Sequence, residues 1–124
     1  ETDINEADIS QEMYFICYGS FDLYRDPVKD GFGHPPGAVL YQEYVDLKSV
    51  NNLQTIPIDK DILVYDYSGQ LSAEVVAYLR LLGYNANSFL FGGCQLIYNR
   101  MVAYMNSYAF IPSEINNFPY ITGE

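Results

Sequence analysis

The chain has 124 residues, of which 49% are hydrophobic and 16% aromatic, which is enough for one compact domain with its own core. Its formal net charge of −10 and its pI of about 4.2 argue against binding to nucleic acid or anionic lipid. No apolar run reaches the length of about 18 residues that a membrane-spanning helix needs, so we expect no membrane span.

The first part of the chain predicts two strands separated by a loop. Residues 1–12 form a polar, acidic lead-in without Met or a signal peptide, which is typical of a mature form whose leader is missing. MYFICYG (13–19) predicts a buried strand, and SFDLYRD (20–26) predicts one helical turn. Gly and Pro at 26–37 predict a surface loop, AVLYQ (38–42) a second strand, and residues 43–56 a weakly patterned helix.

The second part of the chain alternates strands and helices more clearly. ILVYD (62–66) is apolar until its last residue, which is typical of a central parallel strand covered on both faces. SAEVVAYLRLLG (72–83) predicts a helix, SFLFGG (88–93) a further strand, and CQLIYNRMVAYMNSY (94–108) a long helix, with an acidic tail over 106–124. The alternation predicts one α/β domain over 1–124 with a central parallel sheet and helices on both faces.

The turn after Asp66 carries the strongest functional signal. Tyr67, Ser68, Gly69 and Gln70 connect a strand end to a helix N-terminus, which is where parallel α/β folds place their sites. Backbone N–H groups in such a turn converge on one point, and the helix dipole adds positive potential there. Glycine permits the tight turn. The arrangement suits a thiolate, a persulfide, a phosphate or a carboxylate.

This turn and two further segments of the chain resemble rhodanese-like domains. GHPPGAV (33–39) is similar to the family's "GHIPGA" stretch, and VYDYSGQLS (64–72) is similar to its active-site loop. LGY (82–84) followed by FLFGG (89–93) is similar to its "GY…v..l.GG" segment. The resemblance covers residues 14 to 105 approximately, and it implies a rhodanese-like three-layer fold with about five parallel strands.

The departures from the family pattern change the functional prediction. The position of the family's nucleophilic Cys is Asp66, and the Arg that closes its loop is replaced by Leu71. The family's first strand usually ends in an Asp-x-Arg pattern, and those two positions are Cys17 and Gly19 in this chain. A carboxylate cannot form the persulfide that the family carries. The resemblance therefore implies a catalytically inactive domain that serves as a binding or regulatory module.

We expect the degenerate loop, Asp66 to Ser72, to be filled from within. The Asp66 carboxylate would accept hydrogen bonds from the loop N–H groups, which lowers its pKa and stabilises the fold by about 1 kcal/mol. It would also repel anionic substrates. The candidate binding residues are Asp66, Ser68, Gly69, Gln70 and His34, although a histidine in a Gly-Pro loop is more often a hydrogen-bonded turn residue. The predicted partner is an unidentified protein or small molecule, without a cofactor.

Two enzymatic alternatives remain open from the sequence. Cys17 lies near the end of the first strand and offers a relocated thiol for a thiosulfate sulfurtransferase-type reaction, although a core cysteine is commoner there. ILVYDYSG also has a likeness to the strand-end motif of haloacid-dehalogenase-type phosphatases, but these need a second Asp where this chain has Ser68.

The cysteines and the C-terminal tail are the features that relate to the cellular compartment of the protein. Cys17 and Cys94 are either paired in a disulfide or are two half-buried thiols, and with the one histidine their spacing fits no metal site. IPSEINNFPYITG (111–123) is similar to secreted rhodanese-like proteins of gut-type bacteria. That similarity implies the bacterial periplasm or cell envelope, with the cytoplasm as the alternative.

Overall fold

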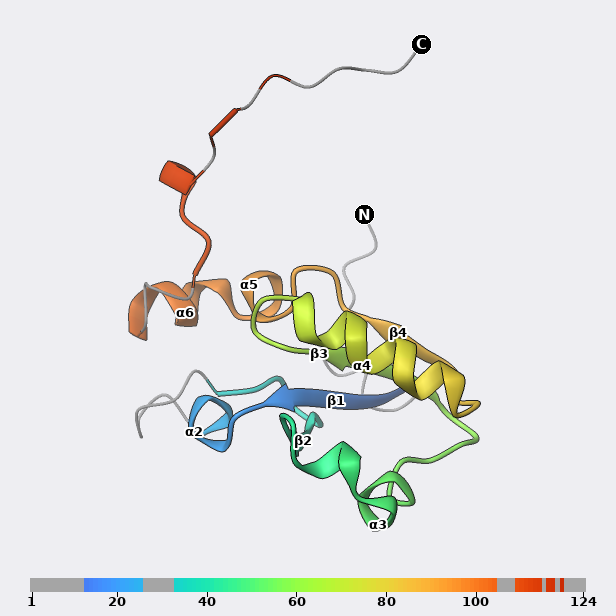
Figure 1. Cartoon of the computed structure of the whole chain (residues 1–124). Helices are drawn as coiled ribbons and strands as arrows, with labels where there is room; N and C mark the ends of the chain where they lie inside the picture. Colours follow the sequence, from blue (N-terminus) through green and yellow to red (C-terminus); the bar gives the residue numbers. More distant parts are fainter. Residues whose placement is uncertain (1–12, 26–32, 105–108, 115, 118, 120–124) are drawn as a thin grey trace.

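The computed structural model describes residues 13–25, 33–104, 109–114, 116–117 and 119. The described residues form one parallel sheet, in the order β2-β1-β3-β4, between two layers of helices (Figure 1). Its strands are β1 (Met13–Gly19), β2 (Val39–Gln42), β3 (Asp61–Tyr65) and β4 (Ala86–Ser88). The predicted α/β class and the parallel sheet are confirmed, but the expected number of about five strands is wrong for this part of the chain, which has four.

The register of the sheet places the carboxyl ends of β1, β2 and β3 next to one another. β1 pairs in parallel with both of its neighbours, the edge strand β2 and the central strand β3, so that Cys17 lies between Leu40 of β2 and Tyr65 of β3. The carboxyl ends of these three strands are therefore adjacent. Glu43 and Asp66, the residues that follow β2 and β3, start from the same edge of the sheet.

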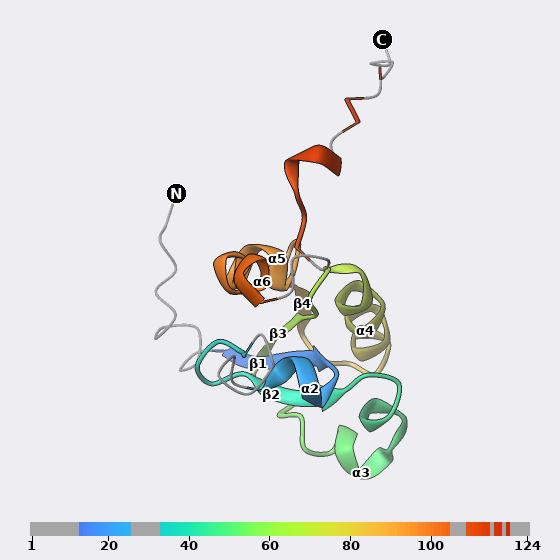
Figure 2. The same cartoon turned by 90° about the vertical axis from the view of Figure 1, so that its left-hand side faces the viewer.

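Alternation along the strands divides the core into two clusters. On one face, Ile16 of β1 and Val64 of β3 pack with α4 (Gln70–Leu81), η2 (Asp46–Lys48) and α3 (Val50–Leu53). On the other face, Phe15 and Tyr65 pack with α5 (Gly93–Leu96), α6 (Tyr98–Tyr104) and α2 (Phe21–Tyr24). Figure 2 shows α5 and α6 on one side of the sheet and α3 and α4 on the other.

Two predicted helices are broken. In the segment 43–56, Asp46 accepts hydrogen bonds from the Gln42 amide at 2.7 Å and the Asn52 side chain at 3.2 Å, and Ser49 is extended between η2 and α3. In the last predicted helix, Ile97 leaves the helical conformation between α5 and α6, with φ −130° and ψ 31°. No helix in the described part of the chain is long and apolar enough to cross a membrane.

The strand predicted over 88–93 is the clearest error. β4 ends at Ser88, and residues 89–92 form a turn in which Phe91 and Gly92 have φ of 60° and 51°. These backbone angles are incompatible with a strand. The predicted turn at 20–26 is present as α2, and a 3-10 turn, η3, spans Pro112–Glu114. The lead-in 1–12, the loop residues 26–32 and most of the tail lie outside the described residues.

Candidate binding site at the Asp66 loop

The loop from Asp66 to Gly69 is held against the turn that follows β4. The Gly93 amide donates to the Asp66 carbonyl at 2.8 Å, and the Cys94 amide donates to the Tyr67 carbonyl at 3.1 Å. A Cβ atom at Gly92 would lie 1.9 Å from the Asp66 carbonyl oxygen, so only glycine fits there. Gly69 has φ 88° and makes the tight turn predicted from the sequence.

The Asp66 carboxylate lies inside the loop and is 3% exposed. Its Oδ2 accepts hydrogen bonds from the Ser68 amide at 3.1 Å and the Ser68 hydroxyl at 2.7 Å, and its Oδ1 accepts one from the Ser72 amide at 3.1 Å. Burial alone would raise the pKa of Asp66, but the hydrogen bonds from Ser68 and Ser72 outweigh it and lower the pKa below its ordinary value. The loop is therefore filled by its own anion, as the sequence suggested.

The two serines connect this carboxylate to the start of α4 and to β4. The Ser68 hydroxyl also accepts a hydrogen bond from the Gln70 amide at 3.3 Å, and the Ser72 and Ser88 hydroxyls are 2.9 Å apart. Gly69 precedes the helix and has no side chain to cap it, so Asp66 and Ser68 satisfy N–H groups of the first turn. Leu71, the other loop residue named from the sequence, packs against the core face that α4 covers.

An acidic hollow of about 460 Å³ opens beside this loop. Three acidic residues are among its lining: Asp22 of α2, and Glu43 and Asp66, which directly follow β2 and β3. The Asp66 carboxylate is almost fully buried there. Asp22 is also paired with Arg25 at 3.7 Å, and both side chains of that pair are exposed, so the pair contributes little. No Lys, Arg or His is among the described residues that line the hollow. The hollow therefore attracts cations and repels anions.

An apolar hollow of about 490 Å³ is also lined by Ser68. Half of its described lining is aromatic, and apart from Ser68 the lining comes from the turn after β4, from α5 and α6, and from the chain after α6: Phe91, Cys94, Gln95, Tyr98 and Phe110. The Tyr98 hydroxyl donates to the Phe110 carbonyl at 3.2 Å, which fixes that segment at its rim. Ser68 is thus common to an acidic hollow and an apolar one.

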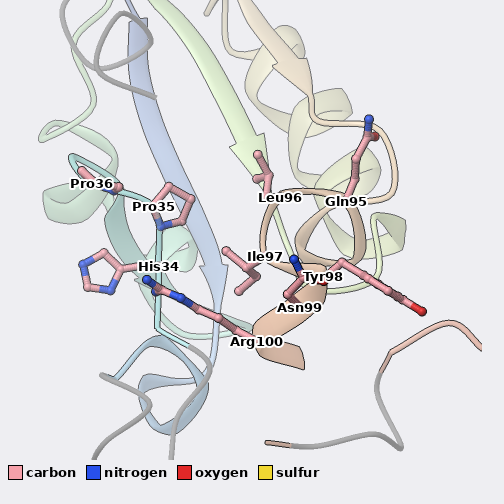
Figure 3. Close-up of a pocket in the computed structure, with 9 residues that line it drawn as sticks. All are labelled: His34, Pro35, Pro36, Gln95, Leu96, Ile97, Tyr98, Asn99 and Arg100. Carbon is pink, nitrogen blue, oxygen red and sulfur yellow. The ribbon is translucent and has the colours of Figure 1, made fainter. Parts of the chain in front are cut away.

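His34, which the sequence grouped with this loop, lines neither of these hollows. It lines a third one of about 260 Å³, where Figure 3 shows His34 and Pro35 facing Ile97 and Arg100. Its Nδ1 is 2.8 Å from the Tyr24 carbonyl, and its ring stacks on the Tyr24 ring at 3.7 Å. His34 is therefore a hydrogen-bonded residue of the Gly-Pro loop, the alternative role weighed from the sequence.

Cys17 lies in the core behind the loop and is fully buried. Its thiol contacts the Tyr67 hydroxyl at 3.9 Å, and burial raises its pKa to about 11. Cys17 forms no disulfide, so the possible Cys17–Cys94 disulfide is absent, although both residues belong to the same core cluster. Within the described part of the chain, no group of three His, Cys, Asp or Glu side chains is placed to hold a metal ion.

Sequence reasoning missed the acidic and aromatic walls of the two hollows. Glu43 follows a predicted strand directly, so a systematic reading of strand ends would have found it. Phe91 gave no such signal, because its segment was predicted as a strand and its left-handed backbone is set by packing against Gly69. In comparisons with family models, curated proteins and solved structures, the chain matches none.

Proposed function

We propose that this chain is a catalytically inactive rhodanese-like domain that serves as a binding module. The observation that carries the proposal is the Asp66 carboxylate, which occupies the interior of the loop and takes hydrogen bonds from Ser68 and Ser72. In the family that the sequence resembles, this position belongs to a thiolate nucleophile. A carboxylate held in this way cannot carry sulfur, and its charge opposes the entry of an anionic sulfur donor.

The alternative, a sulfurtransferase that uses Cys17, finds no support in the geometry. The attacking species in such a reaction is a thiolate that solvent and substrate can reach. Cys17 is fully buried, and its raised pKa of about 11 leaves it almost entirely protonated at neutral pH. Leu71 also offers no cation to a sulfur donor. A binding role accounts for a retained scaffold with an exposed site at its strand ends.

Sulfur loading tests this proposal directly. The chain and its Asp66→Cys variant are incubated with thiosulfate, and persulfide is detected by intact mass together with thiocyanate release from cyanide. We expect no sulfur on the unmodified chain. Sulfur on Asp66→Cys would show that only the nucleophile has been lost, whereas its absence there would show that the pocket has also diverged. Sulfur on the unmodified chain would overturn the proposal, and replacing Cys17 and Cys94 by Ser would locate it.

A further inference from the structure

We propose that the two hollows that share Ser68 form one docking surface for a segment of a partner protein that carries a Lys or Arg side chain beside an aromatic or aliphatic one. This inference rests on the proposed binding function and names the chemistry of the partner. The acidic hollow would receive the cationic group, and the apolar hollow would receive its neighbour.

Charge complementarity selects a cationic partner. Glu43 has no ion pair with any described Lys or Arg. Asp66 is another lining residue of the same hollow, and its hydrogen bonds lower its pKa below the ordinary value. The chain as a whole carries a formal net charge of −10, so long-range attraction acts in the same direction as the local charges. An anionic segment would be repelled at every stage of approach.

The apolar side chains around the second hollow are too exposed for an unoccupied surface. Phe91 and Phe110, which both line the hollow, are 61% and 52% exposed. Contiguous exposed apolar side chains of this kind mark interaction surfaces. A small amine would leave most of them in water, whereas an extended or helical protein segment covers them. This is the reason for choosing a protein segment as the occupant.

The backbone holds Phe91 in this exposed position at a cost. Phe91 has φ 60°, a left-handed conformation that is unfavourable for a bulky side chain. A Cβ atom at Gly69 would lie 3.0 Å from both the Phe91 nitrogen and its Cα, so the Phe91 backbone rests directly on the Asp66 loop. The turn that carries Phe91 is therefore packed on the loop that carries Ser68, the residue that both hollows share.

Selection from a library of displayed random linear peptides tests the inference. The library is selected on the full chain and, in parallel, on the chain with Glu43→Lys and Phe91→Asn combined; asparagine is chosen because it tolerates a left-handed backbone. We expect the peptides specific to the unmodified chain to carry Lys or Arg close to Leu, Phe or Tyr. The best peptide is then synthesised with a fluorophore, and its Kd is measured by anisotropy.

Matched variants locate the binding. Glu43→Lys and Phe91→Asn should each raise the Kd at least about tenfold. Asp59→Lys and Leu81→Asn make the same changes at exposed positions away from both hollows and should leave it within about twofold. Thermal unfolding confirms that each variant is folded.

Three results would overturn the inference. The first is that no peptide prefers the unmodified chain to the double variant, or that the preferred peptides lack a cationic residue. The second is a Kd that the variants at Glu43 and Phe91 do not change. The third is that 2-phenylethylamine binds as tightly as the best peptide, which would make a small amine the ligand. If any of these results is found and thiosulfate still loads no sulfur onto the unmodified chain, the docking surface is wrong and the proposed catalytic inactivity stands. If thiosulfate does load sulfur onto the unmodified chain, the proposed function is itself wrong.

Discussion

The Ser72 amide donates to Oδ1 of Asp66 at 3.1 Å, and this contact ties the first turn of α4 to the end of β3. We expect Asp66→Asn to lower the free energy of unfolding by about 1 to 3 kcal/mol, because the new NH₂ group would face an N–H or O–H donor inside a buried loop. Urea unfolding at pH 7 measures this. The exposed substitution Asp59→Asn serves as the control and should change stability by less than about 0.5 kcal/mol. Equal effects of the two substitutions would show that the Asp66 carboxylate does not stabilise the fold through these hydrogen bonds.

The same carboxylate should make stability depend on pH in the acid range. Its hydrogen bonds depress the pKa of Asp66 in the folded state below the ordinary value of 3.8. The folded state therefore binds fewer protons there than the unfolded chain, so this contribution is fully present above the ordinary pKa and is lost as pH falls through the folded value. The difference in unfolding free energy between the chain and Asp66→Asn should be constant above about pH 5 and shrink below about pH 4. A difference that grows on acidification would contradict the assignment.

Cys17 should be unreactive in the folded protein. Burial raises its pKa from 9.0 to about 11, which lowers its thiolate fraction at pH 8 by about 100-fold, and the surrounding core blocks the reagent as well. In a Cys94→Ser variant, labelling with a disulfide reagent such as DTNB should be at least about 100-fold slower in buffer than in denaturing urea. Fast labelling in buffer would restore Cys17 as a candidate nucleophile.

Much of the fold follows from local sequence patterns. The apolar runs at 13–19 and 62–66 predicted the central strands β1 and β3, and the run at 38–42 predicted the more exposed edge strand β2. The helix predicted over 72–83 is present as Gln70–Leu81. The turn at Asp66 could also be predicted from the sequence, because Asp66, Ser68 and Gly69 interact within a few residues of one another.

The features that were not predictable depend on distant parts of the chain. Gly92 and Phe91 form a turn because their backbones pack on the Asp66 loop, more than twenty positions earlier in the sequence. The fifth strand came from the resemblance to rhodanese-like domains rather than from a fifth apolar run of this chain. His34 was named as a candidate binding residue together with the loop, whereas the structure places it against Tyr24, at a separate hollow.

The contact between Gly92 and the Asp66 loop predicts a severe effect of a single methyl group. Gly92→Ala would place a Cβ atom 1.9 Å from the Asp66 carbonyl oxygen and should destabilise the protein by about 3 kcal/mol or more. Gly83→Ala is the matched control: it also has positive φ, at 94°, but an added Cβ meets nothing within 4 Å. Gly83→Ala should lower the free energy of unfolding by only about 1 to 2 kcal/mol, which is the cost of a residue with a Cβ atom at positive φ. Urea unfolding of both variants separates the steric clash from the backbone preference, and similar losses would show that the clash is relieved.

The Tyr65 hydroxyl gives the last prediction. Its oxygen is buried without a partner of ordinary hydrogen-bond geometry among the described residues, and the Cys17 thiol is its one weak polar neighbour there. The ring is fully buried against Phe15, with centroids 5.0 Å apart. Burial of a hydroxyl without a partner is unfavourable, and burial also raises the pKa of Tyr65 and keeps it neutral. Tyr65→Phe removes the oxygen and keeps the ring, so it should leave stability unchanged or raise it by up to about 1 kcal/mol. Tyr67→Phe is the comparison, because its hydroxyl contacts the Cys17 thiol and its loss should be destabilising. A clear loss of stability in Tyr65→Phe would mean that a buried water or another partner satisfies this hydroxyl in solution.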